Sequence, residues 1–96
     1  MTELDPSPVL AALAVDPQLR AYVRDGEIAV MPGKVSRRRL LLQAIAGSFE
    51  PGIRYSERDV SDFLGALYPD YAALRRYLVD EGLLSRADGL YWRSGN

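Results

Sequence analysis

Two helical stretches separated by about three residues constrain the fold of this chain more than any other feature of its sequence. Ser56 and Asp59 have the spacing of a capping box, which satisfies the free backbone amides at a helix start. Pro69 and Asp70 end this helix and begin the next one. The sequence therefore predicts helices near residues 56–67 and 70–81. The first helix repeats apolar residues at the i, i+3, i+4, i+7 spacing of a buried face: Val60, Phe63, Leu64 and Leu67.

A helix before this pair and two strands after it complete the pattern. Ser36 is expected to begin a helix near residues 36–48, with Val35 and Leu40 at hydrophobic-staple positions. Residues 83–93 have the pattern of a β-hairpin, with an Asp-Gly turn between two apolar-rich strands. The other residues expected in the core are Leu41, Ala44, Ile45, Phe49, Tyr71, Leu74 and Leu78. The order of elements predicts an α+β, mainly helical fold: a winged helix-turn-helix with a C-terminal β-hairpin wing and an N-terminal helical extension.

Residues 1–24 are expected to form the N-terminal helical extension, apart from a winged-helix-like domain over residues 25–96. The apolar run at 9–15 predicts one short helix, and Asp16-Pro17 has the pattern that begins another. Asp25-Gly26 is expected to stop that second helix, before a short strand in the segment EIAVM. The extension has more apolar residues than one domain edge needs to cover: Val9, Leu10, Leu13, Leu19, Tyr22 and Val23. We therefore expect a symmetric homodimer through residues 1–24.

The chain contains no cysteine and no histidine, which narrows the chemistry open to it. These residues are the usual zinc and copper ligands, and histidine is the commonest general base near neutral pH. Glu57, Asp59 and Asp62 are the best catalytic candidates, but no nucleophile or phosphate-binding glycine loop accompanies them. We therefore expect no enzymatic activity, no metal and no cofactor. The longest apolar run is far too short to cross a membrane, so we expect a cytoplasmic protein without a membrane partner.

Several long motifs lie between residues 25 and 93: DGEIAVMPGK, RRRLLLQAIAGSFEPGIRYSERDVSDFL, DYAALRRYLVDEGLLSR and DGLYWR. In these motifs the sequence resembles the bacterial family called domain of unknown function 2087. The resemblance implies a winged-helix-like module of the kind often attached to helix-turn-helix regulator domains. The sequence departs from the family pattern at Ser61, where asparagine is usual, and at Tyr68-Pro69, where a segment with histidine is usual. The charged positions that carry over are Glu57, Asp70, Arg75, Arg76 and Arg86.

Arg76 is the first candidate for contact with DNA, because it lies nearly opposite the expected core face of its helix. Ala72 and Ala73 beside it are small enough to let DNA approach closely. The alternative role for Arg76 is a solvated ion pair with Asp80, one helical turn away. Arg75 lies beside the core face, where we expect its stem to pack and its guanidinium to pair with a carboxylate.

Arg37, Arg38 and Arg39 occupy the first turn of their helix, where positive charge opposes the helix dipole. Three such residues indicate an acidic partner, and phosphate backbone is the commonest one. The alternative is a solvated basic turn that Glu27 or Glu50 neutralises.

The hairpin adds Arg86 and Arg93, which suit either contact with DNA backbone or the solubility of an exposed sheet edge. Tyr91 and Trp92 alternate along the strand, so one is expected to face the core and the other to cover a neighbouring surface. Packing is the favoured role of Trp92 over base stacking.

The leading hypothesis is a DNA-binding transcriptional regulator that acts as a dimer. The alternative is a protein-interaction or small-ligand-sensing winged-helix module without DNA binding. The sequence pI of about 5.3 and the acidic N-terminal third favour the alternative, because DNA binding depends on neutralising several phosphates. The basic turn and Arg76 favour DNA.

Overall fold

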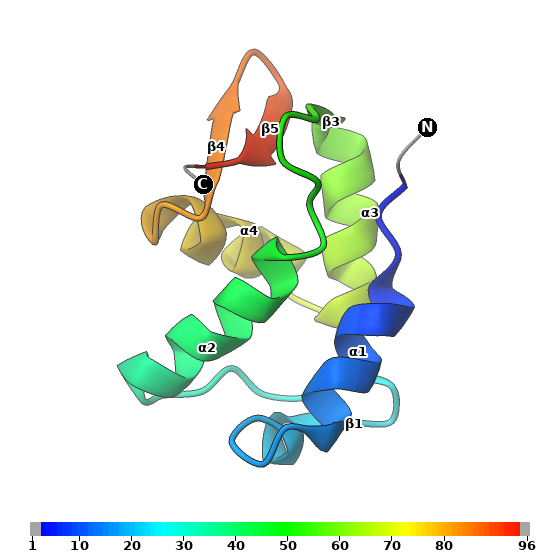
Figure 1. Ribbon diagram of the computed structural model, residues 1–96, viewed down its shortest axis with the longest axis vertical. Coiled ribbons are helices and arrows are strands. Elements are labelled where there is room, and N and C mark those ends of the chain that lie inside the picture. The colour runs from blue at the N-terminus through cyan, green and yellow to red at the C-terminus, as the bar shows by residue number, and fades with distance from the viewer. Residues whose placement is uncertain (1–2, 95–96) are drawn as a thin grey trace.

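The computed structural model describes residues 3–94 of the chain. This part folds into four α-helices and two small antiparallel sheets (Figure 1), so the predicted α+β, mainly helical class is confirmed. The helices are α1 (Pro6–Val15), α2 (Val35–Ala46), α3 (Glu57–Leu67) and α4 (Tyr71–Asp80), with a short 3-10 helix at Arg20–Tyr22. The strands are β1 (Val23–Arg24), β2 (Glu27–Ile28), β3 (Tyr55–Ser56), β4 (Leu84–Ala87) and β5 (Leu90–Arg93).

Side-chain caps begin three of the four helices. The Ser56 hydroxyl accepts a hydrogen bond from the Asp59 amide at 3.0 Å, and Asp70 accepts one from the Ala73 amide at 3.1 Å. Asp5 accepts one from the Ser7 amide at 3.0 Å ahead of α1. These bonds satisfy amides that have no partner within the helix, so the predicted starts of α3 and α4 are confirmed.

The predicted start of α2 at Ser36 is wrong. The helix begins at Val35, after Lys34, and no side chain caps it. Val35 therefore lies inside the first turn instead of ahead of it, where a hydrophobic staple requires it. Val35 and Leu40 are 48% and 37% exposed, so neither contributes a staple to the core.

The larger sheet has the strand order β3-β5-β4 and contains the predicted hairpin. Asp88 and Gly89 both have positive φ, 53° and 75°, which is the backbone conformation of a two-residue type I′ turn. This turn pairs Ala87 with Leu90 and Arg86 with Tyr91. The hairpin stands at one end of the molecule, and β1 lies at the opposite end (Figure 1).

The second helix expected after Asp16-Pro17 is wrong in type and length: a 3-10 helix of three residues forms at Arg20–Tyr22, and Val23 lies in β1. Asp16 instead holds a turn, because its side chain accepts from the Gln18 amide at 2.8 Å. Asp25 and Gly26 have positive φ, 54° and 78°, and form a second hairpin turn that pairs β1 with β2. The predicted strand in the segment EIAVM shortens to Glu27–Ile28, because β1 offers only two residues to pair with.

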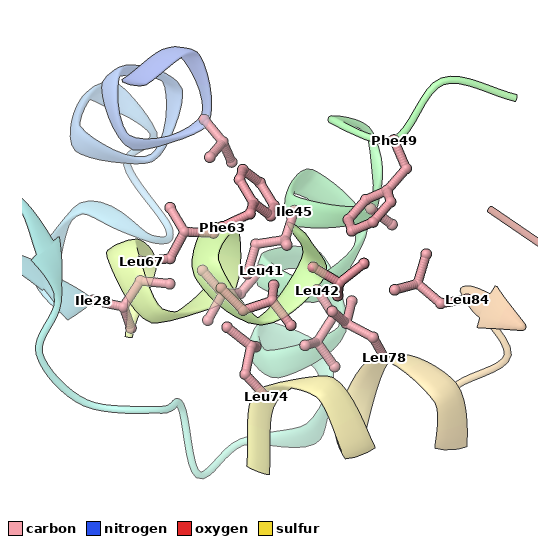
Figure 2. Packing of buried hydrophobic residues seen from close by; sticks show 14 of the residues in the cluster. Ile28, Leu41, Leu42, Ile45, Phe49, Phe63, Leu67, Leu74, Leu78 and Leu84 are labelled. Carbon is pink, nitrogen blue, oxygen red and sulfur yellow. The ribbon is translucent and has the colours of Figure 1, made fainter. Parts of the chain in front are cut away.

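One continuous hydrophobic core joins all four helices (Figure 2). Phe49 lies fully buried within it, edge-to-face against Tyr55 and Phe63 at centroid distances of 5.2 and 5.6 Å. Tyr71 is 43% exposed, so its predicted place in the core is wrong. It occupies the first position of α4, where its ring lies over Gly65 of α3. The predicted core residues that are buried are Leu41, Ile45, Phe49, Val60, Phe63, Leu64, Leu67, Leu74 and Leu78, and Ala44 is partly buried.

The apolar residues of the N-terminal segment enter this same core. Val9, Leu13 and Leu19 are at most 5% exposed. The other three residues of that set, Leu10, Tyr22 and Val23, are partly buried against the cluster. The apolar surplus from which a homodimer through residues 1–24 was expected is therefore covered by the chain itself.

Candidate functional site

A groove between α4 and β4 brings several of the predicted site residues together. Its volume is about 270 Å³. Three arginines from two elements line this groove, together with one carboxylate and two small apolar residues. The lining residues are Ala72, Arg75, Arg76, Val79, Asp80 and Arg86.

Arg76 is exposed on the outer side of α4, as its position in the helix predicts. It has no hydrogen-bond or ion-pair partner among residues 3–94, where the one ion pair joins Arg39 to Glu81. The Arg76–Asp80 pair that the alternative role requires is therefore not formed. The guanidinium of Arg76 has all its donors available to a ligand.

Arg75 is half-buried on the side of α4 that meets α3. Its Nη1 donates a hydrogen bond to the Ser61 hydroxyl at 2.8 Å. The prediction that Arg75 pairs with a carboxylate is therefore wrong. Ser61 occupies the inward, half-buried position of α3, whereas the acids Glu57 and Asp62 are exposed.

Arg86 reaches the groove from β4 and is held there by Tyr91. Its Nη1 donates to the Tyr91 hydroxyl at 3.5 Å, and that hydroxyl donates to Oε1 of Glu57 at 3.3 Å. The hydrogen bond to Tyr91, with the nearby charges of Glu57 and Asp80, raises the pKa of Arg86. Like any arginine, Arg86 is cationic at neutral pH.

Ala72 and Ala73, the two alanines of α4, are less exposed than expected. Ala72 lines the groove, but Ala72 and Ala73 are both half-buried. The Ala73 amide is occupied by the cap at Asp70. A ligand can therefore approach α4 closely at the groove, beside Ala72, more readily than along the rest of the helix.

The first-turn arginines of α2 lie outside the groove, and each has a contact within the chain. Arg37 donates to the backbone carbonyl of Gln18 at 3.5 Å. Arg38 donates to the carbonyl of Pro32 at 3.4 Å and lies over the Tyr77 ring, 5.2 Å from its centroid.

Arg39 forms the ion pair with Glu81, at 3.0 Å between Nε and Oε1. The alternative prediction, that Glu27 or Glu50 neutralises this basic turn, is therefore wrong. The segment that follows α1 and the end of α4 lie next to this turn, and they supply its partners instead.

The family model described as an uncharacterized protein conserved in bacteria, domain of unknown function 2087, matches residues 27–93. The chain belongs to this family. The match covers every lining residue of the groove and leaves α1 outside. The chain has no significant match among curated proteins or solved structures.

Several residues that shape the groove region carry almost no functional signal in the sequence alone. The Tyr91 hydroxyl, Ser61 and Glu57 were not expected to hold the arginines of the groove. Arg54 lies over the Trp92 ring, 4.0 Å from its centroid. One signal was present in the sequence: a two-residue turn at Asp-Gly places Arg86 directly opposite Tyr91.

The remaining predictions for Tyr91 and Trp92 agree with the structure. Tyr91 is 1% exposed in the core, and Trp92 is half-buried beside Arg54. Arg93 is turned to the core side of the hairpin, where it donates to the carbonyl of Phe49 at 3.4 Å.

The carboxylates considered for catalysis do not share one site. Asp59 and Asp62 line a separate hollow, whereas Glu57 is bonded to Tyr91. Within residues 3–94 no three acidic side chains gather closely enough to hold a metal ion. In the same part of the chain, no helix has the length and apolar content needed to span a membrane.

Proposed function

We propose that the chain is a DNA-binding regulatory module that contacts DNA with α4 and the β4–β5 hairpin. The observation that carries the proposal is the pair of exposed arginines, Arg76 and Arg86, on either side of one groove without a carboxylate partner. A helix and an adjacent hairpin that present arginines together match the way winged helix-turn-helix proteins meet DNA.

The packing of α4 supports this orientation. Leu74 and Leu78 are fully buried against the core, which turns the opposite side of the helix, with Arg76, toward solvent. The loop between α3 and α4 spans only Tyr68–Asp70, so the two helices are held at a fixed angle. The arginines of α2 are left out of the proposed surface, because their guanidinium groups are already engaged within the chain.

The charge of the chain sets the affinity for DNA that we expect. With a net charge of −1, the chain has no general attraction for DNA, so binding depends on the local groove charge. Affinity should therefore be modest, with a salt dependence set by the few phosphates that the groove neutralises. The rival function, a protein-interaction or small-ligand-sensing module, predicts no salt-dependent DNA binding at all.

Fluorescence anisotropy with a labelled duplex of mixed sequence, at about 50 and 200 mM salt, tests the proposal. Each neutralised phosphate should weaken binding by about threefold across this salt interval. Arg76→Ala should weaken binding by about fivefold and reduce the salt slope by about one.

The matched control is Arg24→Ala, which removes one positive charge from β1 at the far end of the molecule (Figure 1). It should leave affinity and slope unchanged. If no duplex binds at the lower salt concentration, DNA binding is refuted and the interaction module takes its place. If duplex binds but both variants behave alike, contact through α4 and the hairpin is refuted.

A further inference from the structure

Three arginines line the groove, and only one carboxylate, that of Asp80, lines it with them. None of the three forms an ion pair within residues 3–94, although Arg39 shows that this chain does form one elsewhere. Like charges brought together repel one another unless an anion lies between them. The groove therefore has an excess of positive charge that the described part of the chain does not neutralise.

Two of the three arginines are held in place from α3. Ser61 accepts the bond from Arg75 at 2.8 Å, and Glu57 accepts the bond from the Tyr91 hydroxyl at 3.3 Å, which in turn accepts from Arg86. Glu57 and Ser61 are four residues apart, so they lie on the same face of α3. Side chains fixed in this way lose less conformational entropy when they bind a ligand.

The size of the groove limits the ligand. Its volume of about 270 Å³ lies below the range typical of pockets for drug-sized molecules. Only Ala72 and Val79 supply apolar surface, too little to hold a base or another large apolar group. A guanidinium offers paired N–H donors in the geometry that phosphate oxygens accept, so a small oxyanion fits this lining best.

We propose that the groove is a binding site for one phosphate group, held by Arg75, Arg76 and Arg86. Ser61 and Tyr91 act as positioning residues, Ser61 for the guanidinium of Arg75 and Tyr91 for that of Arg86. The phosphate comes either from a DNA backbone or from a free phosphate or phosphate ester. The first source rests on the proposed function, and the second does not.

The test is a ¹H–¹⁵N NMR titration of the full chain with inorganic phosphate, at constant ionic strength maintained with chloride. The arginine Nε–H resonances of Arg75, Arg76 and Arg86 should shift and saturate together, while that of Arg24 stays still. Arg86→Gln should raise the dissociation constant for phosphate by about fivefold or more, and Arg24→Gln should leave it unchanged. Shifts that fail to saturate, or that are equal at Arg24, would show screening only and overturn the site.

The positioning role has its own variants. Tyr91→Phe keeps the buried ring and removes the hydroxyl, and it should raise the phosphate dissociation constant by about threefold. Tyr77→Phe is the matched control, because Tyr77 is half-buried beneath Arg38, away from the groove lining. A Tyr91→Phe protein that remains folded and binds phosphate as tightly as the parent chain overturns the positioning role.

Competition separates the two sources of phosphate and the two proposals. Displacement of bound duplex by inorganic phosphate, with both affinities reduced in Arg86→Gln, supports the site and a DNA source. Saturable phosphate binding in a protein that binds no duplex supports the site with a free phosphate ligand, and it refutes the proposed function. Duplex binding that neither phosphate nor Arg86→Gln affects leaves DNA binding in place and overturns the phosphate site.

Discussion

Replacement of Leu13 by alanine tests whether α1 is part of the same folded unit as the groove. Leu13 is 1% exposed and lies in the core shared with α2, α3 and α4. Leucine-to-alanine changes at such positions cost about 3–5 kcal/mol, because the cavity left behind adds to the lost burial. A chain of this size has a total stability of about 5–14 kcal/mol, so the loss is a large fraction of it. The melting temperature should fall by about 12 °C or more.

Val15→Ala is the matched control on the same helix, because Val15 is 77% exposed. It should change the free energy of unfolding by less than about 0.5 kcal/mol. Urea unfolding should be followed by Trp92 fluorescence, which reports on β5, and by far-ultraviolet circular dichroism, which reports on the helices. If Leu13→Ala leaves the Trp92 transition unchanged while part of the helical signal melts early, α1 is a separate extension and the shared core is refuted.

Two further changes test the hairpin and the phase of α4. In Gly89→Ala the added Cβ would meet no atom within 4 Å, but the alanine must adopt a φ of +75°. The substitution should therefore lower the free energy of unfolding by about 1 kcal/mol, as measured by calorimetry. An unchanged melting temperature would refute the turn. Arg75→Ala should cost about 1 kcal/mol, since it loses the bond to Ser61, and Arg76→Ala should cost less than about 0.5 kcal/mol. The reverse order in chemical denaturation would show that the orientation of α4 is wrong.

The sequence predicts the second half of the chain well, because its signals there are local. Apolar spacing and hydroxyl or carboxylate caps define α3 and α4 without reference to any other element. The turn at Asp88-Gly89 likewise fixes the hairpin and its register. Each of these features depends on residues within about one helical turn or one two-residue loop of each other.

An Asp-Gly pair near the N-terminus forms a hairpin turn where the sequence predicts a helix end. Asp25-Gly26 and Asp88-Gly89 have nearly the same φ angles, and both pairs connect paired strands. An Asp-Gly pair after apolar residues at helical spacing also fits a helix end, and the segment before Asp25 shows that spacing. The pairing of Val23 with Ile28 and the turn at Asp16 decide the outcome, and neither is visible from periodicity alone.

The groove was only partly predictable for a related reason. Periodicity places Arg76 on the outside of α4 and Arg75 beside the core, as observed. It does not identify the partner on another helix, so Ser61 was missed and a carboxylate was expected instead. The contacts of Arg37 and Arg39 were missed in the same way, since Gln18 and Glu81 are far from them in sequence.

The partners of Arg75 and Arg86 distinguish a structural role from a binding role. A carboxylate holds Arg39 and cancels its charge, whereas hydroxyl groups hold Arg75 and Arg86 directly and leave their charge in place. Ser61→Asp tests this distinction, because it should keep Arg75 in position while neutralising it. The free energy of unfolding should change by less than about 1 kcal/mol, because partly exposed ion pairs contribute little.

Phosphate binding by the Ser61→Asp protein should weaken by about fivefold or more, since the new carboxylate competes for the guanidinium and repels the anion. Thermal denaturation and the phosphate titration, made on the same sample, give the two results independently. Ser61→Ala is the companion variant: it removes the partner but keeps the charge, so it should weaken phosphate binding less than Ser61→Asp. If Ser61→Asp binds phosphate as tightly as the parent chain, the positive charge of Arg75 has no part in ligand binding. Its bond to α3 then serves only to hold two helices together.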